Sequence, residues 1–468
     1  MPTAFVRCLF GVVAVSLSPA FAVSQGELRG KEAMKAGFAK VRITPPLGTT
    51  MYGFGSRDRQ HGCEGIHDDL FLRALYLCHH GEEALIMGFD LLFFGRDDAD
   101  RYKGAIGNEL DLSPRQILLN TSHTHCGPMV GTTWAYADYG LGVADRFYRD
   151  ELEQAIVQAA RHARERAAEV TLWAGAGRTT LPVSRRQPDG QGSILWAPYR
   201  DGVTCDHLPV CLFRNEMGEA VCLLFSVSCH PSTIGGFEIS ADYPGAAMDL
   251  LDEHLGAECS LFLQGTGGDA KASVIGQGEK WRRGTWEDVA EAGRIVADEV
   301  IQTLDAGLTE IQPQIRSSLM EMALPLQPAP DRAALEAIAS DEREKEVKRL
   351  WAERQMERLD RHQTLRTHVP VLLHGIQLGQ GLRLIALEGE AVAGLGLHIL
   401  DFYRGQATTF PLGYTDGMQM YLPTSAMLDE GGYEVVSYFE YGQPAPLARG
   451  IEEIITKSLE RMQARGIE

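Results

Sequence analysis

The segment LLNTSHTHCGPMV, residues 118–130, holds two histidines two positions apart. His123 and His125 follow an apolar run and precede Gly127 and Pro128, so they stand where a strand would end. If the strand continues through them, both imidazoles share one face, because side chains alternate along a strand. Neutral imidazole is a common metal ligand, so the pair favours a metal site once further ligands join it.

A third histidine occupies the same kind of position. His230 in LLFSVSCHPST ends another apolar strand, directly before Pro231. Ligand sites in α/β sheets gather beyond the carboxyl ends of strands, and catalytic zinc uses at least three protein ligands. Three histidines at two strand ends therefore predict a catalytic metal site.

Two more strand ends carry polar residues. FLQGTGGDAKAS ends in Asp269 and Lys271 after a glycine-rich turn that lacks the spacing of a phosphate loop. LIALEGEAVAGLG places Glu388 and Glu390 before a glycine-rich helix start. A carboxylate at this position either interacts with the helix N-terminus or binds a metal, and both readings stay open.

Strands and helices alternate along the chain. An alternating strand in AGFAKVRITPPLG stops at the two prolines, and two strands flank the turn at 80–82. Apolar periodicity predicts helices at 98–110, 143–169, 244–255 and 286–304, and strands at 117–125, 170–180, 208–230 and 259–265. This pattern indicates an α/β fold with mixed β-sheets flanked by helices.

Length and composition indicate one catalytic domain. The chain has 468 residues, of which 44% are hydrophobic and 23% charged, and no fixed-period repeat. We expect a single domain over 36–468 with a charged helical insertion at about 331–361, whose charges favour a solvated helix or hairpin. The net charge of −19 argues against a nucleic-acid partner, because phosphate binding needs a basic face.

The first 22 residues have the pattern of a secretory signal. A short apolar run follows one arginine and closes with Ala20-Phe21-Ala22, and a membrane anchor is the alternative. Later segments are too short to span a bilayer, so we expect a periplasmic or secreted protein without a transmembrane segment. Eight cysteines follow the signal with no CxxC pair, so a structural zinc cluster is not expected, and some cysteines could pair in an oxidising compartment.

Eight stretches of the chain form a recognisable set, in this order: AGFAKVRITPP, GIHDDLFLRAL, NTSHTHCGP, SCHPST, ISADYPG, FLQGTGGD, LEGEAV and MYLPT with GGYE. Together they resemble the catalytic domain of the neutral/alkaline (non-lysosomal) ceramidase family. The similarity runs from about residue 36 to 442, without the family's C-terminal immunoglobulin-like domain.

The resemblance implies one catalytic zinc ion and a set of site residues. Its implied ligands are His123, His230, Glu390 and Tyr421. The implied active-site residues are His125, Tyr433 and Arg185, with Arg186 as the alternative if the alignment slips by one. Zinc bound by imidazoles and a carboxylate lowers the pKa of water to about 7, so the implied chemistry is hydrolysis.

The chain departs from the family at two places. Lys271 occupies the position of the family's serine nucleophile, and Ser273, two residues on, is not assumed to replace it. Cys126 occupies another serine position, where it either binds metal or packs. Lys271 would place a positive charge near the leaving or anchoring end of the substrate, or act as a base.

We therefore expect a secreted zinc-dependent amidohydrolase that cleaves a small-molecule or lipid amide. His125 would move the proton or, with Tyr433 and Arg185, stabilise the oxyanion. One alternative is an esterase, lactonase or sugar-amide hydrolase with a small anionic substrate, and another is a non-catalytic zinc-binding protein. A third alternative is a two-metal phosphoesterase in which Asp242 and Asp269 bridge a second ion. If no second ion binds, these two aspartates make turn or cap hydrogen bonds. The loops FGSRDRQHGC and TTWAYADYGLG are candidates to line a groove.

Overall fold

A mixed sheet of nine strands carries the histidine segments. Its strand order is β12-β10-β9-β6-β1-β3-β4-β5, with β16 paired to β6. Within this sheet β4–β5 and β10–β12 are parallel pairs and the remaining pairs are antiparallel. The strands are β1 (Met34–Arg42), β3 (Phe71–His79), β4 (Glu82–Phe89), β5 (Ile117–Thr121), β6 (Ala168–Arg178), β9 (His207–Arg214), β10 (Ala220–Val227), β12 (Ser260–Gln264) and β16 (Thr309–Ile311).

The two edges of this sheet lie against each other. Asn120 at the end of β5 donates from Nδ2 to the carbonyl of Gln264 over 3.3 Å, and the Gln264 amide donates to Asn120 Oδ1 over 2.7 Å. The sheet therefore curls until β5 and β12, the first and last strands in its order, are neighbours. This closure brings together segments that lie more than a hundred residues apart in the sequence.

A second sheet of four strands packs on the first. It consists of β17 (Pro313–Pro325), β18 (His368–Gly379), β19 (Leu382–Leu387) and β21 (Thr408–Leu412). Buried apolar side chains of both sheets, among them Leu118, Leu224 and Leu384, form one cluster between them. Burial of this apolar surface is the main force that holds the two sheets face to face.

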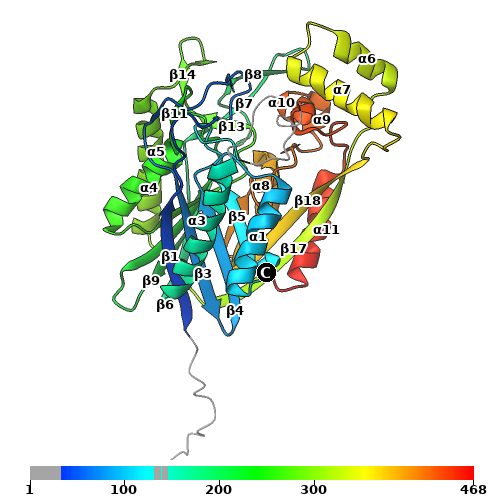
Figure 1. Cartoon of the computed structure of the whole chain (residues 1–468). Coiled ribbons are helices and arrows are strands. Elements are labelled where there is room, and N and C mark those ends of the chain that lie inside the picture. The colour runs from blue at the N-terminus through cyan, green and yellow to red at the C-terminus, as the bar shows by residue number, and fades with distance from the viewer. Residues whose placement is uncertain (1–32, 59, 131–138, 140–145) are drawn as a thin grey trace, which may run out of the picture. The chain divides into compact units, whose positions relative to one another are not determined.

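Helices cover the outer faces of both sheets. Helices α1 (Arg96–Leu110) and α3 (Arg146–Glu165) pack on β1, β3, β4 and β5, while α4 (Asp242–Leu255) and α5 (Trp286–Asp305) pack on β9, β10 and β12. Helices α8 (Ala393–Phe402) and α11 (Ile451–Gln463) cover the four-stranded sheet. The result is a layered α/β fold with mixed sheets flanked by helices, as the sequence predicted (Figure 1).

Short elements surround the end of the sheets where the histidines lie. The strands are β2 (Gly65–Ile66), β7 (Pro182–Pro188), β8 (Ile194–Tyr199), β11 (Glu238–Ile239), β13 (Ala270–Ala272), β14 (Ile275–Gly276), β15 (Lys280–Trp281), β20 (Glu390–Ala391) and β22 (Tyr421–Leu422). The helical turns are η1 (Pro114–Gln116), α9 (Met427–Glu430), α10 (Tyr433–Val436) and η2 (Ser437–Tyr441).

The charged segment at 331–361 forms two helices, α6 (Arg332–Ser340) and α7 (Glu346–Asp360), drawn in yellow in Figure 1. Most of its charged side chains are exposed or half-buried, but Trp351 is fully buried and its indole Nε1 donates to the carbonyl of Gln443 over 2.9 Å. The hairpin is therefore fastened to the body of the fold by an apolar anchor.

The computed structural model describes residues 33–468 except 59, 131–138 and 140–145, so the predicted signal at 1–22 lies outside it. Ala33–Glu468 forms one compact unit. Among the described residues no helix has the length and apolarity needed to cross a bilayer. All eight cysteines of this part are unpaired, and Cys78 alone among them is not buried.

Candidate metal centre

The histidines leave the sheet at the carboxyl ends of β5 and β10, as the sequence predicted. The prediction that a strand continues to residue 125 is wrong, because β5 ends at Thr121. His123 then adopts a left-handed backbone conformation, with φ of 67°, which is uncommon for residues other than glycine. Local strain of this kind is typical of functional sites.

Glu390 and Tyr421 are brought together by strand pairing. β20 and β22 are parallel, and their register sets Glu390 beside Tyr421. The glycine-rich turn after β12 packs closely beneath Glu390, since a Cβ on Gly268 would lie only 2.7 Å from the Glu390 carbonyl oxygen. The glycines there serve the close backbone approach that the sequence indicated.

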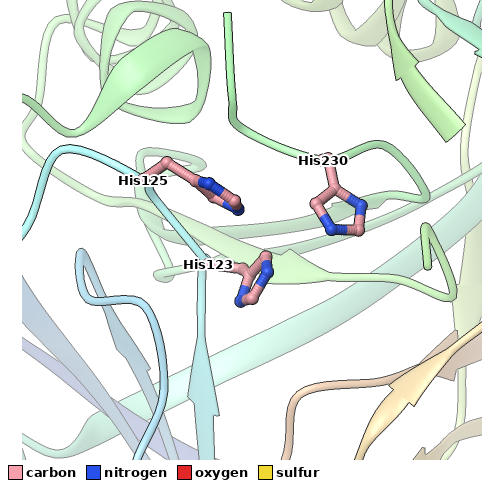
Figure 2. A group of neighbouring side chains, drawn as sticks. All are labelled: His123, His125 and His230. Atoms are coloured by element: carbon pink, nitrogen blue, oxygen red, sulfur yellow. The ribbon is translucent and has the colours of Figure 1, made fainter. Parts of the chain in front are cut away.

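The side chains of these residues converge on one point. Glu390 Oε2 lies 3.2 Å from Nε2 of His123 and 3.2 Å from Nε2 of His230. The hydroxyl oxygen of Tyr421 lies 3.3 Å from the same nitrogen of His230. Figure 2 shows the rings of His123, His125 and His230 extending from two chain segments toward a shared space. All four predicted metal ligands are therefore adjacent.

The donor set fits a cation. Nδ1 of His123 donates to the carbonyl of Leu92 over 2.9 Å, and Nδ1 of His230 donates to that of Gly267 over 2.7 Å. Burial lowers the pKa of His230 to about 4, so its ring is neutral at pH 7. With the proton on Nδ1, the lone pair of Nε2 faces Glu390 Oε2, which has no hydrogen-bond partner in the described chain. The nitrogen and carboxylate lone pairs thus face one another with no proton between them, and a metal ion can bind such a set of lone pairs.

His125 lies beside these ligands but is held differently. Its ligand nitrogen lies within 4.8 Å of those of His123 and His230. Neither of its ring nitrogens has a hydrogen-bond partner among the described residues, and burial lowers the pKa of the ring well below its usual value. Metal-binding histidines are normally oriented by a bond from the second nitrogen, so His125 fits a neutral base better than a ligand.

The centre forms the floor of a cavity of about 920 Å³. Its walls combine aromatic rings with charged groups of both signs. The loop FGSRDRQHGC contributes residues to it, whereas most of TTWAYADYGLG lies outside the described residues. The cavity is lined by Tyr52, Gly53, Phe54, Gly55, Ser56, Arg57, Asp58, Gln60, Leu92, Phe93, His123, His125, Arg185, Trp196, Ser232, Lys271, Lys345, Glu346, Val347, Glu390, Tyr421, Tyr433, Glu440 and Tyr441.

Arg185 stands directly behind Tyr421. Its Nη2 donates to the Tyr421 hydroxyl over 3.0 Å and its Nε to Glu434 over 2.8 Å, while the Trp196 ring centroid lies 4.1 Å from the guanidinium. Burial raises the pKa of Tyr421 well above its usual value, and the charge of Arg185 acts in the opposite direction. Arg186 bonds to Glu434 without lining the cavity, so Arg185 is the arginine at the site.

Tyr433 also lines the cavity, and its hydroxyl donates to Glu440 over 2.8 Å. Tyr441, which the sequence analysis did not single out, lies closer to the donors, because its hydroxyl donates to Glu390 Oε1 over 2.5 Å. It belongs to the short turn η2, whose sequence has no pattern that points to a site. The GGYE motif contains Tyr433, which lies eight residues before Tyr441.

Lys271 lines the cavity from β13 and is partly buried. Burial is the main cause that lowers its pKa to about 8, and the charge of Arg185 adds to the shift. Ser273 is exposed and does not line the cavity. The serine two residues after Lys271 therefore does not take up the position of a nucleophile.

The remaining candidates are structural. The carboxylate of Asp242 accepts from the amides of Thr233 and Tyr243, and that of Asp269 accepts from the Ala393 amide. Cys126 is buried, its Sγ lies 3.6 Å from the carbonyl of Ile234, and burial raises its pKa to about 12. The aspartates make turn and cap hydrogen bonds, so the geometry does not favour a second metal ion between them.

Comparisons with known proteins agree with this geometry. No protein-family model matches the sequence, and no curated protein matches it. Solved structures of ceramidases match with high probability. The neutral ceramidase from Pseudomonas aeruginosa is 15% identical with a TM-score of 0.70, over 92% of this chain and 73% of that one. A ceramidase complexed with C2 is 14% identical with a TM-score of 0.71, over 93% of this chain and 76% of that one. The resemblance drawn from the motifs is thus confirmed in the tertiary structure: this chain has the neutral ceramidase fold.

Proposed function

We propose that this chain is a zinc-dependent hydrolase that cleaves an N-acyl amide bond. The observation that carries the proposal is the convergence of two Nε2 lone pairs, a carboxylate oxygen and a phenol oxygen at the floor of a cavity. Nitrogen and oxygen donors in this number suit one zinc ion. The fold shared with two ceramidases supports the amide as the bond that is cleaved.

His123, His230, Glu390 and Tyr421 would hold the ion. When bound, zinc supplies Lewis acidity, which polarises an acyl carbonyl and makes water more acidic. The chain itself supplies orientation, because the Leu92 and Gly267 carbonyls fix the two imidazoles and Tyr441 fixes the carboxylate. Such supporting bonds keep ligands in place through a reaction.

His125 is the residue placed to move protons. Its ring centroid lies 4.9 Å from that of His123 and 5.7 Å from that of His230, and neither of its nitrogens has a hydrogen-bond partner among the described residues. As a neutral imidazole it accepts the proton of the attacking water at a ring nitrogen and returns it to the leaving amine nitrogen. The step balances in atoms and charge. The water oxygen forms a bond to the acyl carbon, the bond from that carbon to nitrogen breaks, and the proton taken from water completes the leaving amine.

Arg185 supplies fixed positive charge beside the reacting carbonyl. Its guanidinium is held by Glu434 and contacts Tyr421, so it keeps one orientation as negative charge develops on the carbonyl oxygen. Tyr433 closes the wall next to Tyr421, with ring centroids 5.5 Å apart. Its hydroxyl already donates to Glu440, so it shapes the site more than it stabilises the oxyanion.

Metal analysis joined to turnover tests this function. Purified mature protein should contain about one zinc per chain and cleave a long-chain N-acyl amide from a fluorogenic panel that includes an N-acyl sphingosine. A chelator should abolish the activity and zinc should restore it. His123→Ala should lose the zinc, while His398→Ala should keep it, since His398 bonds to Thr456 on α11, away from the cavity.

If the protein contains zinc but cleaves no amide of the panel, two alternatives remain: a non-catalytic zinc-binding protein, or a hydrolase that cleaves another kind of bond. Two metal ions per chain would favour the phosphoesterase alternative. A His123→Ala variant that retains both zinc and activity would contradict the proposed ligand set.

A further inference from the structure

The backbone of Lys271 is held in place from two sides. β13 pairs with β7 so that Lys271 lies opposite Val183, and a parallel bridge joins Lys271 to His230. The amide of His230 donates to the Ala270 carbonyl over 3.0 Å. The backbone of Lys271 is therefore paired with that of His230, a proposed metal ligand, and its side chain lines the same cavity.

Two other cations of this cavity, Arg185 and Lys345, have carboxylate partners. Arg185 lies 2.8 Å from Glu434, and Lys345 lies 3.7 Å from Glu440. The side-chain ammonium of Lys271 forms no ion pair or hydrogen bond with any of the residues that the structure describes. Its Nζ lies over the ring of Trp281, 5.1 Å from the ring centroid.

A partly buried ammonium without an anion is costly, because lysine is seldom buried unless it is paired. A cation–π contact with one ring compensates for only part of the hydration that is lost. No carboxylate of the described residues forms an ion pair with Nζ, and the charge of Asp242 acts on it only from a longer distance. The position is therefore suited to an anionic group of a ligand.

We propose that the substrate carries an anionic group, a carboxylate or a phosphate, that binds Lys271 while the amide lies at the metal centre. This inference rests on the proposed function and names its substrate class. Phe54, Phe93 and Trp196 supply aromatic wall for the apolar acyl chain. The substrate is therefore an N-acyl compound with an acidic head group, in contrast to a neutral N-acyl amino alcohol.

Two matched pairs of substrates test the proposal. The first pair is N-dodecanoylglycine with N-dodecanoylglycinamide, and the second is N-dodecanoylethanolamine phosphate with N-dodecanoylethanolamine. Zinc-loaded protein should prefer the acidic member of at least one pair by about tenfold or more in kcat/KM, the effect of one charge-assisted hydrogen bond. The pair with the larger ratio identifies the anion as carboxylate or phosphate.

Variants connect this preference to one side chain. Lys271→Met should bring the ratio close to one, and Lys271→Arg should keep most of it, which also shows that the position tolerates substitution. The matched control is Lys345→Met, because Lys345 lines the same cavity but is exposed and faces Glu440. This control should keep the full ratio.

Two results would overturn the proposal: equal turnover of both members of each pair by the wild-type protein, or an unchanged ratio in Lys271→Met. If no compound is cleaved, the proposed function fails by itself, and calorimetric titration of the same four compounds then decides the anion site. Tighter binding of an acidic member that Lys271→Met removes would sustain the site, and equal binding of the acidic and neutral members would refute it.

Discussion

The floor and the wall of the cavity are built in different ways. At the floor, the imidazoles of His123 and His230 are each fixed by a carbonyl, and Glu390 is fixed by Tyr441. On the wall, Lys271 contacts a ring but forms no ion pair among the described residues, and Trp196 is 48% exposed. The floor is determined by bonds within the protein, whereas the wall keeps groups that a ligand would satisfy.

The difference between floor and wall corresponds to two tasks, the reaction itself and the recognition of the substrate. Groups that react must hold one geometry, and supporting bonds supply it. Groups that recognise a substrate gain their partner only when it binds, so their bonds remain open in the free protein. The floor should therefore respond to mutation through metal content and turnover, and the wall through substrate preference and local stability.

The largest effect is expected at the floor, from Glu390→Gln. Loss of the carboxylate charge should release zinc and lower kcat by on the order of 10³, because carbonyl activation by the ion contributes several kcal/mol. Metal content and turnover measure both effects. Glu388→Gln is the matched control, since Glu388 is buried two residues away but bonds to Arg96 and Gln419. If both variants keep their zinc, the floor is not a metal centre.

The next effect concerns the hairpin that carries Lys345, Glu346 and Val347 into the wall. Trp351→Ala should lower the free energy of unfolding by about 3–5 kcal/mol, because a fully buried indole leaves a cavity. Urea unfolding measures this change, and Glu353→Ala, exposed on the same helix, should stay within about 0.5 kcal/mol. Zinc content should not change, and a loss of zinc in Trp351→Ala would contradict the separation of floor and wall.

A smaller effect distinguishes His125 from the ligands. His125→Gln should keep about one zinc per chain and lower kcat by about 10²-fold, the usual contribution of a general base. Zinc analysis of the folded variant is the decisive measurement. Loss of zinc equal to that in His123→Ala would instead make His125 a third nitrogen ligand.

The smallest effect lies beneath the floor, where Asp416 accepts from the Leu119 amide and faces Lys103 and His374. Burial alone would raise the pKa of Asp416, but these two neighbours lower it to about 2. A lowered pKa stabilises the fold above the ordinary value near 3.8, and this stability is lost as pH falls from about 4 toward 2. The loss should be roughly 2 kcal/mol.

Urea unfolding across this pH range measures that loss. Asp416→Asn should be less stable at pH 6 and should lose roughly 2 kcal/mol less than the wild type between pH 4 and pH 2. Equal losses in both proteins would show that Asp416 does not carry this pH dependence.

Much of the fold follows from local pattern. The turn at 80–82 lies between β3 and β4, and the helix predicted at 143–169 contains α3, with Leu152, Ile156 and Ala159 buried on one face. These features depend on side chains a few residues apart, which the sequence displays directly. The strand predicted at 117–125 is too long, because the left-handed backbone at His123 depends on contacts with distant segments.

Local sequence patterns are sufficient to predict the alternation of strands and helices and the residue types at the ends of β5, β10, β12 and β19. That these ends meet is a property of the tertiary structure. β5 and β12 are the outermost strands of the large sheet, and only its curling, secured by Asn120 and Gln264, closes the floor. Tyr441 and the open position of Lys271 also became visible only there, because a bond between residues far apart leaves no local pattern in the sequence.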